Sequence, residues 1–330
     1  MEKTKNNEHW SRQKEEGSLG TTKFLLFLFK IFPIGLLRII AFPVGFFYFL
    51  FSARAKRESR RFLTAVSEYI EDEKIKKRAK NYFSPLRHII SFALSLLEKI
   101  QSWGGKYKLK NVSFYDDDIN ELIRELESGK GVFLIISHLG NAEVLRGLFN
   151  QGQTGVSRKI PFTAIMDIKV TSNFTKMLNE INPESGMDII SADEIGPQTA
   201  VILEERLSSG GMVMVAGDRT SAIDKNIKRI SFLGKEAPFP SGMFYIAALL
   251  NAPVYFIFGF RKKELSIRSK YDMYVHKSGI SLSSESTRKE RMEQSSLIAE
   301  SFASLLEKYC KKYPFQWYNF FNFWLNEEER

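Results

Sequence analysis

Cysteine and histidine are scarce in this chain of 330 residues, and their scarcity excludes several kinds of site. A single cysteine, Cys310, cannot form an intramolecular disulfide and leaves no cysteine cluster to hold a metal. The histidines do not form an HExxH pattern, and no CxxC motif occurs. The sequence therefore predicts no metal site, either structural or catalytic.

Three signatures of common enzyme folds are also missing. The sequence has no GxGxxG pattern, which dinucleotide-binding folds use, and no GxxxxGK[ST] phosphate loop. It lacks the GxSxG nucleophile elbow of the α/β-hydrolases as well. These absences argue against all three classes of enzyme.

Acidic residues are outnumbered by basic ones. The chain has 48 Lys and Arg against 38 Asp and Glu, which gives a net charge of +10 and a pI near 9.4. This excess predicts an anionic partner, which can be nucleic acid, a membrane surface or an acidic protein. The basic residues are spread along the chain, and their dense cluster at 54–61 directly follows a long apolar run. That position favours a membrane and argues against nucleic acid.

The long apolar run covers Phe24 to Phe51 and follows a polar tail at residues 1–22. It is long enough to cross a bilayer, for which about 20 residues suffice. However, Lys30 and Arg38 would lie in the hydrocarbon, where a charge costs about 3 kcal/mol. We expect a membrane-associated helix or helical hairpin lying partly in the interface, with Lys30 and Arg38 reaching lipid head groups. A pair of buried helices in a soluble protein is the alternative.

We divide the chain into three parts on this basis. A polar tail (1–22) is followed by a membrane-associated segment with a basic flank (23–61) and by one large domain (62–330). The large domain is expected to begin with two helices over 62–102, separated near Pro85, with His88 on a helix surface and no chemistry in this region.

Short apolar strands alternate with helices through the rest of the large domain. Strands are expected at 132–136, 162–166, 188–190, 212–216 and 253–260, and helices at 119–127, 173–181, 199–207, 241–250 and 296–309. Residues 261–294 are polar and are expected to form edge strands and loops. This alternation predicts an α/β fold with a mostly parallel central sheet flanked by helices on both faces.

Aromatic residues crowd the end of the chain. Eight of the twelve residues in 313–324 are Phe, Tyr or Trp, which is too many for a solvated tail. The segment must pack on the core, line an apolar groove, or lie among lipid head groups.

A polar loop follows the strand predicted at 132–136 and contains His138. In α/β sheets, the chemistry is carried by loops at the carboxyl ends of the strands. We expect Asn141 near the N-cap of the next helix and Glu143 in its first turn, where the helix dipole favours a carboxylate. Glu143 could then fold back and orient His138 as a general base. A single loop histidine with a purely structural role is the alternative.

Several features occur in a fixed order along the chain. They are the apolar, basic-flanked N-terminus, His138 and Glu143 in an HxxxxE pattern, Gly217-Asp218-Arg219, FLGKEAPFPSG at 232–242, and YPFQW at 313–317. Together they resemble the lysophospholipid-type acyltransferases, in the branch that contains the late acyltransferases of lipid A biosynthesis. The resemblance runs from about Trp10 to Trp324. The segments SHLGNAE (137–143) and PFQWYNF (314–320) are similar to members associated with aryl-polyene or related lipid clusters.

This resemblance implies a membrane-associated O-acyltransferase of glycerolipid acyltransferase-like fold, on the cytoplasmic face of a bacterial inner membrane. His138 would remove the proton from a lipid hydroxyl, which then attacks an acyl thioester on acyl carrier protein or coenzyme A. Glu143 would hold the imidazole of His138. No bound cofactor is implied, because the thioester is a co-substrate.

The resemblance also implies a set of substrate-binding residues. Arg219 is the candidate for an anion contact, either to a phosphate of the acceptor or to the developing oxyanion, and Asp218 would fix Arg219 or bind a hydroxyl. Two glycines would shape a loop at the acyl or acceptor channel. The full set is Asn141, Lys169, Asp218, Arg219, Gly234 and Gly242.

The chain departs from the family pattern at residues 164–169. Family members often carry Arg or His there, whereas this chain has an acid at Asp167 and offers Lys169 as the substitute.

Two other functions stay open. One is a lipid thioesterase or hydrolase that uses water as the acceptor at the same histidine, and the other is a non-catalytic lipid-binding homologue.

Overall fold

The computed structural model describes residues 31–103, 107–115, 118–150, 152–166, 187–192, 195–220, 227–268 and 270–324. Its helices are α2 (Ile34–Phe51), α3 (Ala53–Ser67), α4 (Glu73–Lys80), α5 (Ser84–Trp103), α6 (Asp118–Glu127), α7 (Glu143–Asn150), α9 (Pro197–Ser208), α10 (Ser241–Leu249) and α11 (Arg288–Lys312). Its strands are β1 (Val112–Phe114), β2 (Val132–Ile136), β3 (Phe162–Met166), β4 (Met187–Ser191), β5 (Met212–Ala216), β6 (Ile227–Phe232), β7 (Lys235–Pro240), β8 (Val254–Arg261) and β9 (Tyr271–Lys277). The polar tail, Lys30, Lys169 and the helix predicted at 173–181 lie outside the described residues.

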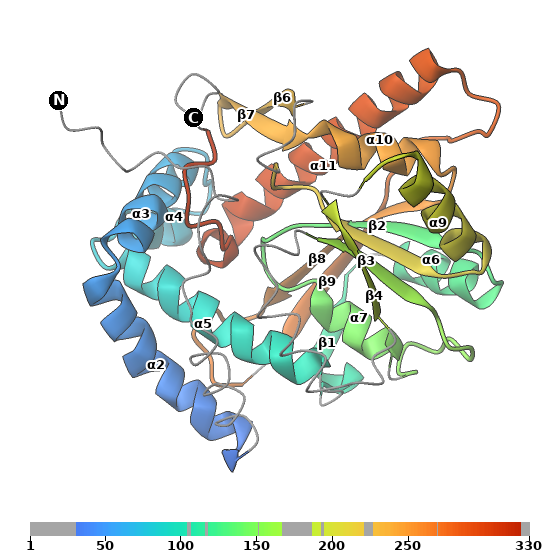
Figure 1. Cartoon of the computed structure of the whole chain (residues 1–330). Coiled ribbons are helices and arrows are strands. Elements are labelled where there is room, and N and C mark those ends of the chain that lie inside the picture. Colours follow the sequence, from blue (N-terminus) through green and yellow to red (C-terminus); the bar gives the residue numbers. More distant parts are fainter. Residues whose placement is uncertain are drawn as a thin grey trace.

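The predicted fold class is confirmed: a seven-stranded, mostly parallel sheet is flanked by helices (Figure 1). The strand order is β1-β9-β8-β2-β5-β3-β4. Strand β9 runs antiparallel to β8, and β1 pairs with β9 in parallel, so these two strands run against the other five. The strands predicted at 132–136, 162–166 and 212–216 have those bounds.

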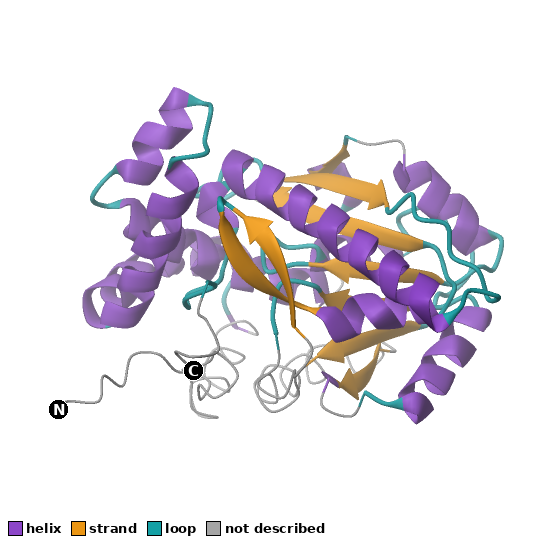
Figure 2. Cartoon of the chain, turned by 90° about the horizontal axis from the view of Figure 1, so that it is seen from above, coloured by secondary structure: helices purple, strands orange, loops and turns teal. Residues whose placement is uncertain are grey.

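The two faces of the sheet bury alternate residues of each strand. On β2, Phe133 and Ile135 join the core formed with α9, α10 and α11. Val132 and Leu134 join the core formed with α6 and α7. Because both faces are covered, the central strands read as continuous apolar runs. Figure 2 shows the N-terminal helices beside the sheet and a long helix laid across the strands.

The predicted positions of one strand and one loop differ from the structure. Strand β9 was expected at an edge, but β1 lies outside it. Gly234 and Gly242 were expected to shape a loop, but the residues between them form strand β7, and Gly242 lies in α10, a helix whose start at Ser241 was predicted. Leu233 and Gly234 both have positive φ, 49° and 69°, which is the geometry of a two-residue hairpin turn.

Helix α2 packs along α5 (Figure 1). Gly45 permits a close approach, because a Cβ there would lie 2.9 Å from Cγ1 of Ile90. The opposite face of α2 is apolar and exposed; it includes Leu36, Ile39, Val44, Phe46, Phe47, Leu50 and Phe51. Among the described residues, α2 is the one helix long and apolar enough to cross a membrane. Alone this is weak evidence for membrane association, since soluble core helices and signal sequences share these properties.

Arg38 corrects one expectation about this helix. Its side chain is buried and turned into the protein, where it donates to the carbonyl of Ile267 at 3.0 Å and to Oε1 of Gln101 at 2.6 Å. Its guanidinium also lies 3.9 Å from the buried carboxylate of Glu98. The prediction that Arg38 reaches lipid head groups is therefore wrong, because partners inside the protein hold it.

Candidate active site

His138 and Asp218 face each other because their two strands are in register. Strands β2 and β5 pair in parallel with Ile136 opposite Ala216, and each chain then continues two residues to the loop that carries the side chain. Nδ1 of His138 lies 2.8 Å from Oδ1 of Asp218. The backbone N–H of His138 donates to the other oxygen, Oδ2, also at 2.8 Å. The carboxyl edge of the sheet thus brings together residues that are far apart in the sequence.

Asp218 is held as an ionised carboxylate. It is fully buried, and its Oδ2 also accepts hydrogen bonds from Nε1 of Trp317 at 3.0 Å and from Nδ2 of Asn319 at 3.4 Å. Burial by itself would raise its pKa, but the interaction with His138, the positive charge of Arg219 and the hydrogen bond from Trp317 bring the pKa below its usual value. An ionised carboxylate can only accept, so Nδ1 of His138 carries the proton.

Nε2 of His138 is therefore the unprotonated nitrogen. The side chain remains 32% exposed, which leaves it open to a substrate. Burial lowers the pKa of the imidazole, and so does the positive charge of Arg219; Asp218 acts in the opposite direction. A neutral, oriented and accessible imidazole at neutral pH is what a general base requires.

The aromatic C-terminal segment packs on the core and fixes the His138 loop. Trp317 is 1% exposed. The N–H of Tyr318 donates to the carbonyl of His138 at 3.0 Å, and the N–H of Gly140 donates to the carbonyl of Gln316 at 2.7 Å. Gly140 has a φ of 77°, and a Cβ there would collide with the carbonyl of Gly259 on β8. Of the three alternatives for this segment, the structure supports packing on the core.

Arg219 is placed beside the histidine by the same C-terminal segment. Its Nε donates to Oδ1 of Asn319 at 3.1 Å, and its guanidinium stacks 5.7 Å from the ring of Phe321. Burial lowers its pKa to about 10, so that it stays charged at neutral pH. Arg219 is therefore a cation within electrostatic range of His138.

Glu143 lies in the first turn of α7, as predicted, but its carboxylate pairs with partners other than the predicted His138. It is the first residue of α7, and its Oε2 accepts a hydrogen bond from Nε of Arg146 at 3.0 Å. Its Oε1 faces Nζ of Lys99 on α5 at 4.0 Å. The expectation that Glu143 orients the imidazole is corrected, because Asp218 takes the Nδ1 position. An i,i+3 ion pair with Arg146 was already visible in the sequence.

The remaining predicted residues lie around the site in different ways. The amide of Asn141 is buried behind the loop, 3.5 Å from the carbonyl of Ser95 and from Oη of Tyr271. Gly234 forms the β6–β7 turn against Tyr69, and Gly242 is the second residue of α10, so neither lies in a channel loop. The hairpin nevertheless reaches the site, since the ring of Phe232 packs 5.3 Å from that of Trp317.

The prediction for His88 is also wrong. It was expected on a helix surface, yet it is fully buried, with Nε2 2.8 Å from the carbonyl of Trp317 and Nδ1 2.9 Å from Oγ of Ser59. Burial lowers its pKa to about 4, so it is neutral and supports the C-terminal segment. Among the described residues, no group of three or more His, Cys, Asp or Glu side chains is placed to hold a metal ion.

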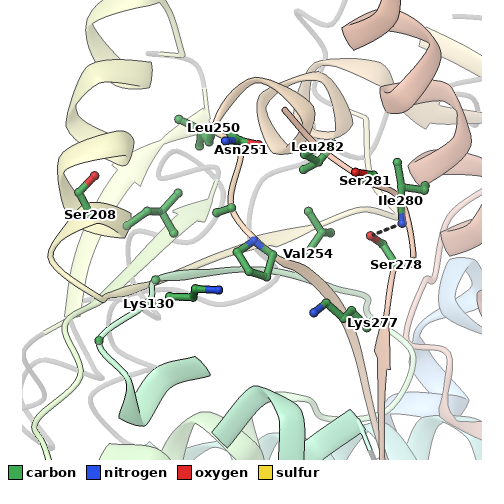
Figure 3. A pocket seen from close by; sticks show the side chains of 16 residues that line it. Lys130, Ser208, Leu250, Asn251, Val254, Lys277, Ser278, Ile280, Ser281 and Leu282 are labelled. Atoms are coloured by element: carbon green, nitrogen blue, oxygen red, sulfur yellow. Dashed lines mark hydrogen bonds between the residues drawn. The ribbon is translucent and has the colours of Figure 1, made fainter. Parts of the chain in front are cut away.

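A separate pocket of about 690 Å³ lies at the opposite edge of the sheet, where β2 and β8 begin (Figure 3). Lys130 and Lys277 are among its lining residues. Lys277 already pairs with Glu121 at 2.6 Å and with Glu125 at 2.9 Å. The charge of Lys277 is therefore balanced within the protein. None of the predicted site residues lines this pocket.

Comparison with known proteins adds no assignment. No protein-family model matches the sequence, and no curated protein matches it. The function has to be inferred from the chemistry of the His138 site and its surroundings.

Proposed function

We propose that this protein is a membrane-associated O-acyltransferase that moves a fatty acyl chain from a thioester to the hydroxyl of a lipid. One observation carries the proposal. Asp218 holds Nδ1 of His138 at 2.8 Å and leaves Nε2 on a side chain that is 32% exposed. The imidazole is thereby prepared to accept a proton from a substrate.

The proposed reaction balances with these groups alone. Nε2 of His138 takes the proton of the acceptor hydroxyl while the hydroxyl oxygen attacks the thioester carbonyl. Asp218 stabilises the imidazolium that forms, and the guanidinium of Arg219 favours the negative oxygen of the tetrahedral intermediate. The carbon–sulfur bond then breaks, and the departing thiolate takes the proton back from His138.

Ser137 adjoins the histidine but is not placed as a nucleophile. It is 6% exposed, and its Oγ accepts a hydrogen bond from the N–H of Leu139 at 3.2 Å. The lone cysteine, Cys310, is buried in α11. These placements favour direct transfer between two substrates over a covalent acyl-enzyme.

The N-terminal helices support the membrane part of the proposal. Helix α2 exposes an apolar face, and α3 follows it with basic residues, which are Arg54, Lys56, Arg57, Arg60 and Arg61. An apolar face beside a basic helix fits a bilayer surface with anionic lipids. We place the enzyme on the cytoplasmic face of a bacterial inner membrane, with acyl carrier protein or coenzyme A as the thioester carrier.

The test is an assay of membranes that contain the wild type, His138→Ala or His276→Gln. His276 lies on β9, bonds Oη of Tyr309 at 2.7 Å, and serves as the control histidine. Each sample receives radiolabelled acyl carrier protein thioester or acyl coenzyme A together with a total bacterial lipid extract.

We expect acylated lipid from the wild type and from the control. The amount should be at least about 100-fold lower in His138→Ala. Free fatty acid as the sole product, lost in His138→Ala, would establish the hydrolase alternative. Equal acylated product from all three forms would eliminate His138 as the base.

A further inference from the structure

Helix α2 packs on α5 over most of its length, and the two helices run in opposite directions. Near the start of α2, the guanidinium of Arg38 donates to Oε1 of Gln101, close to the end of α5. In the middle of α2, a Cβ on Gly45 would lie 3.6 Å from Cβ of Ile90. Near the end of α2, Phe49 packs against the first two turns of α5. The two helices therefore form one paired unit.

This pairing argues against an α2 that crosses the bilayer. The other side of α5 is bound to the large domain, through Nε2 of His88 at 2.8 Å from the carbonyl of Trp317 and through Oγ of Ser102, which donates to the carbonyl of Glu143 at 3.1 Å. If α2 crossed together with α5, this domain would have to enter the hydrocarbon. If α2 crossed alone, the guanidinium of Arg38 would leave its partners and enter the hydrocarbon unpaired, which is costly.

The face of α2 that is turned away from α5 is suited to lipid. The buried residues of α2 repeat along one side of the helix, which is the side that packs on α5. Between Ile34 and Phe51 the one charged residue is Arg38, and it is buried. The exposed face of α2 therefore carries no charged side chain and ends at Phe51, which is 83% exposed. A helix with one face on protein and an apolar face outward can lie in the plane of a membrane, within one leaflet.

A second apolar point lies in the turn between α4 and α5. The N–H of Arg87 donates to the carbonyl of Phe83 at 3.3 Å, so the helical path of α5 extends back to Phe83. Phe83 is seven positions before Ile90, and residues seven apart share one face of a helix. Because Ile90 faces α2, Phe83 projects on that side, at the end of α5 where α2 ends. Tyr82 and Phe83 are 72% and 60% exposed.

Basic side chains of α3 lie beside both apolar points. Nζ of Lys56 is 5.1 Å from the ring centre of Phe49, and the guanidinium of Arg60 is 5.3 Å from that of Tyr82. A second copy of this chain would bring the same positive charge to the surface, whereas an anionic leaflet supplies the opposite charge. Charge complementarity therefore favours lipid as the occupant.

We propose that the exposed face of α2 and the Tyr82–Phe83 turn form one surface that embeds in a single leaflet of an anionic bilayer, while α2 stays paired with α5. This inference rests on the membrane part of the proposed function and adds the orientation of the protein. The axis of α2 lies parallel to the membrane, and Phe83 is a second point of insertion.

Depth measurements with single labels test this orientation. Cys310 is the one cysteine of the sequence and is buried, so an introduced cysteine can be labelled selectively with a fluorophore. Labels are attached to full-length Leu36→Cys, Leu50→Cys and Phe83→Cys. The matched control is Val201→Cys on α9, an apolar residue that is 56% exposed and lies on the far side of the sheet from α2 (Figure 1). Phosphatidylglycerol vesicles with doxyl groups at different depths quench the fluorophores.

The labels at Leu36 and Leu50 are expected at the same depth, about 5 to 10 Å below the head groups. The label at Phe83 should also be quenched, and the label at Val201 should not. Replacing phosphatidylglycerol by phosphatidylcholine should weaken binding at least about tenfold. Leu36 and Leu50 are about 21 Å apart along a helix, so a depth difference near that value would show a spanning helix and overturn the proposal. An unquenched Phe83 label, or equal binding to both lipids, would also contradict it.

A disulfide between Gly45→Cys and Ile90→Cys tests whether α2 stays on α5, since a Cβ separation of 3.6 Å fits that bond. The oxidised and reduced forms should bind the vesicles equally. Binding lost on oxidation and restored on reduction would show that α2 leaves α5, and a dimer with α2 labels shielded from doxyl lipid would assign the face to a second copy; either result overturns the proposal. Neither measurement needs acyl transfer, so failure here is distinct from failure of the lipid assay.

Discussion

Two buried carboxylates adjoin the His138 loop, and their partners differ in kind. Asp218 receives the N–H groups of His138 and Trp317, which carry no permanent charge. Glu143 faces the basic side chains of Arg146 and Lys99. The first carboxylate can respond to a proton that arrives on the imidazole, whereas the second is already committed to balancing charge.

The difference teaches that distance along the chain does not identify the acid that orients a histidine. Glu143 is five positions from His138, but the first turn of α7 directs it toward α5 and Arg146. Asp218 is 80 positions away, yet the β2–β5 register places it opposite the imidazole. Strand pairing, and not local spacing, decides the contact.

The largest effect is expected from Asp218→Asn. The amide has one acceptor oxygen, so it cannot accept from both the backbone N–H and Nδ1–H of His138. The proton is then no longer held on Nδ1, and the imidazolium that forms in the reaction loses the negative charge that stabilises it. The kcat should fall on the order of 10⁴-fold, while KM changes little, as measured by initial rates over a range of acceptor concentrations. An effect no larger than that of Glu143→Gln would mean that Asp218 does not serve the histidine during the reaction.

Glu143→Gln should instead act chiefly on stability. It leaves Arg146, whose side chain is 2% exposed, without its carboxylate. Removing one partner of a buried pair is expected to cost about 3 kcal/mol in the free energy of unfolding, measured by denaturant titration. The kcat should fall far less than in Asp218→Asn.

The matched control is Glu293→Gln on α11, the exposed partner of Lys289, which should change stability by no more than about 0.5 kcal/mol. If Glu143→Gln kept full stability but lost kcat to the extent of Asp218→Asn, Glu143 would be the orienting acid that the sequence indicated.

The fold was largely predictable because the pattern of apolar residues along the central strands matches the residues that the structure buries. Continuous apolar runs identified β2, β3 and β5, and each is covered on both faces. The β6–β7 hairpin was missed because its strands alternate weakly and Lys235 and Glu236 are exposed. The start of α11 was placed eight residues too late, since its first two turns are polar and are stabilised by a Thr287–Glu290 capping box.

Most residues of the site could be predicted from the sequence, but the contacts between them could not. His138 was identified from its position after a strand, and Asp218 and Arg219 from the family resemblance; the structure brings His138 and Asp218 into contact. Their pairing depends on which strands are neighbours, which periodicity does not reveal. Lys99 carried no signal, because a lysine near the end of a helix is ordinarily solvated. Only the packing of α5 on α7 brings its Nζ to 4.0 Å from Oε1 of Glu143.

The smallest expected effect is a shift of the acidic limb of the pH profile. Its direction should differ between a variant of Asp218 and a variant of Lys99. The pKa of His138 lies below its usual value of 6.5, so kcat/KM should rise with pH through that lowered pKa and be constant near neutrality. Asp218 raises this pKa, whereas Arg219 and Lys99 lower it. The acidic limb of the profile should therefore move to lower pH in Asp218→Asn and to higher pH in Lys99→Gln. A limb that stays in place in either variant would show that the charge removed there does not reach the histidine.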